Sequence, residues 1–383
     1  MKTADGILYF DNAATTYPKP ESVIRAVTYC MRESGGNPGR GSHTMALRAA
    51  EEIYACREEA ASFFGASEAE QVIFTMNTTH ALNLALKSVI RPGDHVLIGS
   101  MEHNAVLRPV SALASLGTVS YSVFSARGTD AQILSGIRAK IRSNTRVMIT
   151  AHVPNIANTA LPIDKIGSLC RQRGITLIVD GAQSAGHLPI DVGRMNIDML
   201  CVPGHKGLYG VQGCGMIVCG SEAITHGRTL IEGGSGVHSL EAGMPDELPE
   251  RYEAGTLPTP AIAGLSAGIR FVKQQGIASL HRRECDLWRR LYTDLSAMPH
   301  VRLYDSTPGS VLLFNIDGIS PAEVSEKLNQ RGICVRSGYH CAPMAHKTLG
   351  SIDNGGVRVS FGAFHTERDV CRLRDEIWNI ARQ

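Results

Sequence analysis

A lysine and an aspartate that each follow an apolar run are the residues of this chain best suited to chemistry. Lys206 comes shortly after the run 197–201, and Asp180 ends the run 177–180. A lysine amine can form a Schiff base with an aldehyde cofactor, and a buried carboxylate can hold a proton on a pyridine ring. A solvated surface lysine is the alternative, but the glycines around Lys206 favour a functional turn. The pair predicts pyridoxal 5'-phosphate (PLP) as the cofactor.

Four further positions could hold the phosphate and the ring of such a cofactor. Thr78 and Thr79 open a helical pattern after a strand-like run, so their hydroxyls and the free backbone N–H groups could cradle a phosphate. A plain N-cap is the alternative for these threonines. His205 could donate to a phosphate oxygen. His103 follows another strand-like run and could lie on the ring or shuttle a proton, although a structural histidine would give the same pattern.

Amide and guanidinium side chains at other strand ends could bind a substrate. Asn155 and Gln183 each follow an apolar run, and Arg358 lies in the strand-like run 357–360. An arginine can bind a carboxylate through two parallel hydrogen bonds. A surface ion pair is the alternative for Arg358.

The segment 332–343 carries a cysteine whose neighbours are unlike those of a core residue. Cys341 stands in a loop with glycine, histidine and proline, whereas Cys334 fits a buried small side chain. The thiolate is the nucleophilic form of cysteine, and a free thiol has a pKa near about 8.5. Arg336 and His340 would favour the anion. The loop therefore predicts a nucleophilic Cys341.

Composition bounds the class of protein. The 383 residues are 43% hydrophobic and 19% charged with a net charge of +2, so we expect no nucleic-acid or membrane partner. An apolar signal segment is absent from the first residues, which favours a cytoplasmic location. The ten cysteines are scattered without a C-x-x-C pair, and the fourteen histidines form no cluster with zinc spacing, so we expect reduced thiols and no metal site. Gly210, Gly213 and Gly215 do not make the dinucleotide-binding fingerprint.

Strand-like runs that are apolar on both faces alternate with amphipathic helical patterns in the first two thirds of the chain. Such runs are typical of a mostly parallel sheet covered by helices, in which ligands bind beyond the carboxyl ends of the strands. The long segment 232–259 is rich in Gly, Pro and Glu and is expected to be functional or interface-forming. We place a domain boundary near residue 261, followed by a smaller α+β domain.

The ordered motifs resemble one family nearly from end to end. The chain is similar to the group II cysteine desulfurases, the selenocysteine lyase-like branch of the class V aminotransferases. The matching motifs, in family order, are the segments 11–16, 40–44, 101–103, 180–183, 204–206, 253–256 and 336–341.

This resemblance implies a PLP-dependent transferase of fold type I, an α/β protein that works as a homodimer. The large domain would carry a mostly parallel seven-stranded sheet, and the smaller C-terminal α+β domain the catalytic cysteine loop. We expect residues 1–20 to pack with the small domain, 21–260 to form the PLP-binding domain and 261–383 the small domain.

By position, the resemblance gives each site residue a role. Lys206, Cys341 and His103 would be catalytic, with Lys206 as the Schiff-base lysine, Cys341 as the sulfur acceptor and His103 stacked on the ring. The expected cofactor contacts are Thr78, Thr79, His103, Asp180, Gln183, His205, Lys206 and Thr256, the last from the partner subunit. The expected substrate contacts are Asn12, Ala13, Arg40, Asn155, Arg336 and Arg358, with Arg40 reaching across from the other subunit.

The implied activity is the conversion of L-cysteine to L-alanine with a persulfide on Cys341. The sulfur would pass to a separate acceptor protein of the SufE or SufU kind, in iron–sulfur cluster assembly or other sulfur metabolism. Three alternatives stay open: a selenocysteine lyase, another class V reaction such as transamination or epimerisation, and a non-catalytic sulfur-relay scaffold.

Overall fold

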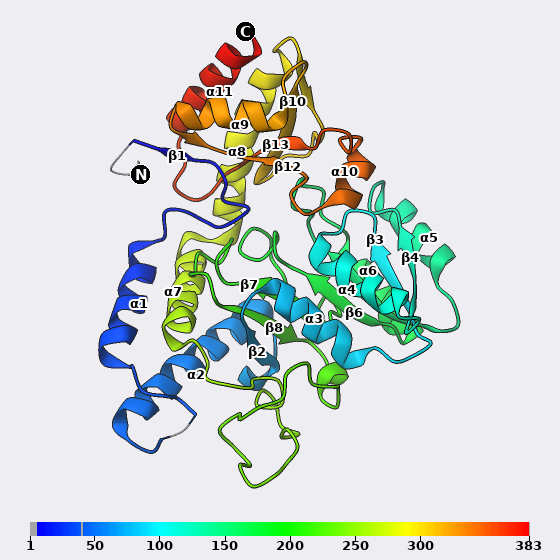
Figure 1. The fold of residues 1–383 in the computed structure, drawn as a ribbon, viewed down its shortest axis with the longest axis vertical. Helices are drawn as coiled ribbons and strands as arrows, with labels where there is room; N and C mark the ends of the chain where they lie inside the picture. The colour runs from blue at the N-terminus through cyan, green and yellow to red at the C-terminus, as the bar shows by residue number, and fades with distance from the viewer. Residues whose placement is uncertain (1–5, 40, 383) are drawn as a thin grey trace.

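A large, mostly parallel sheet forms the centre of the molecule (Figure 1). The computed structural model describes residues 6–39 and 41–382. Within them a seven-stranded sheet has the order β2-β8-β7-β6-β5-β3-β4, and β8 runs antiparallel to both of its neighbours. The strands, in that order, are Val72–Thr75, Gly215–Cys219, Met199–Pro203, Thr176–Asp180, Thr145–Ala151, His95–Gly99 and Ser120–Phe124. The predicted α/β class and the mostly parallel seven-stranded sheet are confirmed.

Both faces of this sheet are buried, which is why its strands read as continuous apolar runs. Alternate residues of one strand belong to different clusters. Leu97 of β3 packs in one core and Val96 and Ile98 in the other. Helices cover both faces. The helices of this part are α1 (Glu21–Glu33), which packs on α7 (Figure 1), α2 (Thr44–Phe64), α3 (Thr78–Val89), α4 (Asn104–Ser115), α5 (Asp130–Lys140), α6 (Ile163–Arg173) and α7 (Thr259–Gln275), with short 3₁₀ turns at Ala69–Gln71 and Glu222–Ile224.

A smaller antiparallel sheet lies at the C-terminal end of the chain. Its order is β12-β13-β10-β9, with strands Arg336–Gly338, Gly356–Ser360, Val311–Ile316 and Val301–Leu303. The helices of this part are α8 (Ile277–Ser296), α9 (Pro321–Gln330), α10 (Pro343–Leu349) and α11 (Glu367–Ala381). The long helix α8 follows α7 after Gly276 and reaches from the large sheet to the small one (Figure 1).

The N-terminal segment joins the C-terminal sheet region to the large sheet. Strand β1 (Leu8–Tyr9) pairs in parallel with β11 (Ile333–Cys334), and Ser360 donates its N–H to the carbonyl of Phe10 at 2.7 Å. Further along, the hydroxyls of Thr15 and Thr16 donate to the carbonyl of His205. Residues 8–16 therefore contact both parts of the molecule, and the three-part division expected above stays a prediction.

No helix within residues 6–39 and 41–382 is both long enough and apolar enough to cross a membrane.

Candidate active site

A cavity of about 110 Å³ opens at the carboxyl ends of β3, β5, β6 and β7, beside the N-terminus of α3. Polar side chains follow each of these strands because ligand-binding residues of a parallel sheet gather at that edge. Eight of the residues expected to bind cofactor or substrate line it together: Thr78, Thr79, His103, Asn155, Asp180, Gln183, His205 and Lys206.

Lys206 lies in the turn after β7. Burial by the surrounding protein lowers the pKa of its amine to about 8, while Asp180 acts in the opposite direction. The preceding carbonyl, that of His205, is held by the amine of Lys19 at 3.0 Å and by Thr16. The turn that presents the lysine is thus fixed by the N-terminal segment. Lys19 is a contact that the sequence analysis missed, because nothing near it in the chain signals its partner.

Asp180 ends β6 and is buried, with 5% of its surface exposed. Its neighbours across the sheet are Ala151 of β5 and Cys201 of β7. One carboxylate oxygen accepts the N–H of Ala182 at 2.9 Å. Burial raises the pKa of this carboxyl group, so a cationic group that shared its pocket would be stabilised strongly.

The N-terminus of α3 and His205 form the end of the cavity suited to a phosphate. Asn77 caps the helix by accepting the N–H of His80, which leaves the threonine hydroxyls for another role. The Oγ1 atom of Thr78 and the Nδ1 atom of His205 are buried without a hydrogen-bond partner among the described residues. Buried polar atoms are normally satisfied, so these two atoms are available to bind a phosphate.

His103 is the N-cap of α4 as well as a wall of the cavity. Its Nδ1 atom accepts the N–H of Ala105 at 3.0 Å. Burial, together with the charges of Lys206 and nearby arginines, lowers the pKa of the ring to about 4. The ring is therefore neutral at physiological pH. His103 therefore both caps α4 and lines the cavity, so both interpretations of this histidine apply.

Glu102, beside His103, was not singled out from the sequence. Its carboxylate accepts both the hydroxyl of Thr150 at 2.8 Å and the N–H of Ala151 at 3.0 Å. These bonds tie the loop that carries His103 to strand β5.

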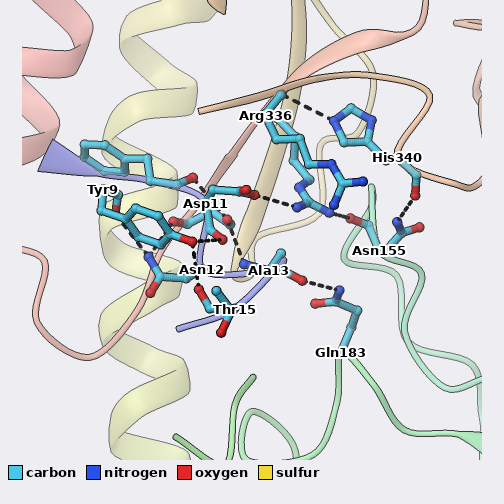
Figure 2. A network of polar contacts seen from close by, with 12 residues as sticks. Tyr9, Asp11, Asn12, Ala13, Thr15, Asn155, Gln183, Arg336 and His340 are labelled. Carbon is cyan, nitrogen blue, oxygen red and sulfur yellow. Dashed lines mark hydrogen bonds and ion pairs between the residues drawn. The ribbon is translucent and has the colours of Figure 1, made fainter. Parts of the chain in front are cut away.

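Gln183 and Asn155 turn toward the rest of the chain rather than standing free (Figure 2). Gln183 donates to the carbonyl of Ala13 at 3.0 Å, and Asn155 donates to the carbonyl of His340 at 2.7 Å. The Oδ1 atom of Asn155 has no partner among the described residues. Through these two amides the cavity contacts the N-terminal segment and the cysteine loop.

Cys341 is exposed, in the loop between β12 and α10. Its carbonyl accepts the N–H of Asn104, next to His103, at 2.7 Å. The φ angles of His340 and Cys341 are 51° and 55°, a left-handed conformation that is uncommon for side-chain-bearing residues and frequent at functional sites. The loop therefore lies against the start of α4, at the edge of the cavity.

The expectation that His340 would supply positive charge to this thiol is wrong. The ring is buried, and burial lowers its pKa to about 3. Its two nitrogens contact His346 at 3.2 Å and the carbonyl of Arg336 at 3.3 Å. His346 in turn contacts the hydroxyl of Ser351 at 2.7 Å. His340 is thus a neutral, structural member of a buried polar chain.

Arg358 is fully buried rather than part of a surface ion pair. Its guanidinium contacts the carboxylate of Asp11 at 2.8 Å and the carbonyl of Asn155 at 3.0 Å. Asp11 belongs to a motif that the sequence analysis noted, yet its side chain was not assigned a role. Asn12, expected at the substrate, instead donates to backbone carbonyls of Tyr9 and Ser360.

Thr256 is not among the residues that line this cavity. Thr256 lines a separate hollow of about 250 Å³ and accepts a hydrogen bond from Asn37 at 3.3 Å. Arg40 lies outside the described residues. In the described part of the chain, no three His, Cys, Asp or Glu side chains gather in a way that could hold a metal ion.

The family model for class-V aminotransferases matches residues 8–373. The chain belongs to the class-V aminotransferase family. A probable cysteine desulfurase of Methanothermobacter thermautotrophicus is 31% identical over 381 residues, which cover 98% of this chain and 94% of that one.

Solved cysteine desulfurases share the whole fold. The apo enzyme of Thermococcus onnurineus has a TM-score of 0.90 and 30% identity, covering 99% of this chain and 95% of that one. The enzyme CsdA of Escherichia coli has a TM-score of 0.89 and 26% identity, covering 99% and 96%. The expected family and fold type I are confirmed.

PLP is the cofactor of the class-V aminotransferases, and the cavity fits it. Lys206 matches the aldehyde and Asp180 the ring nitrogen, while the unpartnered atoms of Thr78 and His205 match the phosphate. The PLP expected from the lysine and aspartate alone is thereby confirmed.

Proposed function

We propose that this class-V aminotransferase is a cysteine desulfurase that converts L-cysteine to L-alanine and leaves a persulfide on Cys341. The observation that carries this proposal is the exposed Cys341 thiol on a loop docked beside His103, at the edge of the cavity that contains Lys206. A transaminase or epimerase has no use for a nucleophilic thiol at this place.

Each residue then has a chemical task. Bound PLP supplies an aldehyde that takes the substrate amine and a ring that stabilises negative charge at Cα. Lys206 takes the proton from Cα, and Asp180 holds the proton on the ring nitrogen. Arg336, Arg358 and Asn155 orient the substrate carboxylate.

The sulfur transfer is the task of the loop. The Cys341 thiolate attacks the substrate sulfur, so that a sulfur–sulfur bond forms as the substrate carbon–sulfur bond breaks. The bonding electrons stay on Cβ, which takes up a proton, and alanine leaves. The loop and the cavity together hold the Cys341 sulfur next to the substrate sulfur, and this proximity supplies much of the rate.

Replacement of the thiol tests the proposal. We expect Cys341→Ser to keep PLP and its visible absorption but to lose persulfide formation and alanine release by at least about 10²-fold. Cys371→Ser, on helix α11, is the matched control. Equal alanine release from L-cysteine by native enzyme and Cys341→Ser would refute the assignment. If the variant kept its rate on L-selenocysteine alone, the protein would be a selenocysteine lyase.

We also propose that the protein is a homodimer in the cytoplasm that passes sulfur to a separate acceptor of the SufE or SufU kind. Thr256 would reach the phosphate of the other subunit, because within its own chain it lies in a different hollow. Its segment is held by Glu253, whose buried carboxylate pairs with Arg57 of α2. The three-part division at residues 20 and 260 belongs to this proposal too.

A further inference from the structure

Two arginines face each other directly in the small sheet. Arg336 of β12 and Arg358 of β13 are register partners in an antiparallel pair. Side chains at such positions lie on the same face about 5 Å apart, and like charges there repel. Arg358 donates to the carbonyl of Asn155, which lines the cavity, so the pair lies beside the cavity.

Asp11 neutralises one of the two. Its carboxylate lies 2.8 Å from Arg358, which is 1% exposed. Arg336 has no hydrogen bond or ion pair from its guanidinium to any described residue. Figure 2 shows Arg336 beside His340, with Asp11 on the other side among residues of the N-terminal segment. The cluster of Asp11, Arg336 and Arg358, here called the arginine cluster, therefore carries one uncompensated positive charge.

The same cluster holds an unused donor. The Nε atom of Arg358 is buried without a partner among the described residues, and so is the Oδ1 atom of neighbouring Asn155. An unpaired N–H in a buried site is costly unless a ligand satisfies it. The unpaired guanidinium of Arg336 and the unused Nε–H of Arg358 could together bind a single carboxylate.

We infer that Asp11 is a specificity-determining residue that restricts the arginine cluster to amino acids with one carboxylate. Arg336 supplies the free charge, and Arg358, already neutralised, supplies a hydrogen bond. An amino acid with two carboxylates would bring one negative charge more than the cluster can offset. This inference rests on the proposed function, which makes the substrate L-cysteine.

Binding to the PLP-loaded enzyme tests the charge count. The probes are L-alanine, with one carboxylate, and L-aspartate, with two, measured by titration calorimetry. In Asp11→Asn the cluster gains a charge, so the affinity for L-aspartate should rise relative to L-alanine by about tenfold or more. Asp317→Asn, an exposed carboxylate in the turn before α9, should leave the ratio unchanged.

Arg336→Gln is an independent test, because it leaves the buried ion pair between Asp11 and Arg358 intact. We expect its affinity for L-alanine to fall by about tenfold or more. The double variant Asp11→Asn with Arg336→Gln returns the cluster to one positive charge, so it should regain most of the L-alanine affinity. A purely structural role for Asp11 would make the double variant worse than either single one.

Two results would overturn the inference: native L-alanine affinity in Arg336→Gln, or no recovery in the double variant. Neither measurement depends on sulfur transfer. Failure of the native enzyme to form a persulfide would refute the proposed function and leave the affinities interpretable.

Discussion

Lys206 is an amine whose surroundings make it a base within the physiological range. Burial lowers its pKa to about 8, well below its value of 10.5 in water. Below that pH the folded protein holds the amine charged, and above it the amine is neutral and nucleophilic.

The rate at which PLP-free protein takes up PLP should follow this pKa. We expect the rate to rise about tenfold per pH unit from pH 6 toward about 8 and to level off above it, because the neutral amine attacks the aldehyde. Stopped-flow absorbance at a series of pH values measures it. A rate independent of pH across this range would contradict a depressed pKa.

At this scale the sequence reveals residues whose role follows from their own position in an element. Lys206, Asp180 and Thr78 were found because strand ends and helix starts are visible as local patterns. Asp11 was missed because its partner, Arg358, lies 347 residues away, and no local pattern encodes that contact. His340 was misread because burial, which sets its charge, depends on α10 packing over it.

The loop that carries Cys341 is stabilised by a chain of hydrogen bonds among His340, His346 and Ser351. The carbonyl of Arg336 can only accept, so the Nε2 atom of His340 carries the proton and its Nδ1 accepts from His346. His346 must then accept from the hydroxyl of Ser351. The direction of every bond is fixed, which gives the loop one defined arrangement.

Ser351→Ala should weaken this element. The change leaves a buried nitrogen of His346 without its donor, and we expect a loss of about 1–3 kcal/mol in the free energy of unfolding. Chemical denaturation followed by circular dichroism measures it. The matched control is Ser296→Ala at the exposed end of α8; equal losses in the two variants would argue against a buried chain.

Asn158 joins the two sheets in a similar way. Its side-chain amide bonds to the carbonyls of Thr307 and Val311 and to the N–H of Val311, at 2.7 to 3.0 Å. Its own N–H donates to Asp305. This one residue therefore fixes the segment that leads into β10 against the loop after β5.

Asn158→Ala should destabilise the protein by about 1–3 kcal/mol, since partly buried backbone groups of the loop 307–311 lose their partners. Thermal unfolding would show the effect, with Asn83→Ala on the exposed face of α3 as the comparison. An unchanged melting temperature would mean that the loop is held by other contacts.

Helices and strands with buried apolar residues were predicted well, whereas short or edge strands were predicted poorly. The apolar runs 177–180 and 357–360 are observed as the buried strands β6 and β13. Strand β4 was missed because it lies at the sheet edge and alternates serine with larger residues, a weak pattern. The pairing of β1 with β11 could not be foreseen, since two-residue strands leave no periodicity.

For the whole molecule, exposed apolar side chains gather on α1 and α2. Tyr29 and Met31 are exposed on α1, and Leu47 and Tyr54, seven residues apart and thus on one face, on α2. Tyr54 lines the same hollow as Thr256. Such a surface suits the proposed dimer.

Leu47→Glu should therefore shift the protein toward a monomer in sedimentation velocity and weaken retention of PLP, because Thr256 of the second subunit would be withdrawn. Leu116→Glu, which changes an even more exposed leucine at the end of α4, should do neither. A monomeric native protein that binds PLP firmly would exclude the dimer.

The N-terminal segment has a consequence for how the enzyme matures. Residues near position 10 contact Ser360, while residues near position 16 hold the turn of Lys206. A ribosome makes residues near position 10 long before Ser360, so this segment gains its contact with the small sheet only when almost the entire polypeptide has emerged. We therefore expect PLP to bind after translation is complete rather than during it.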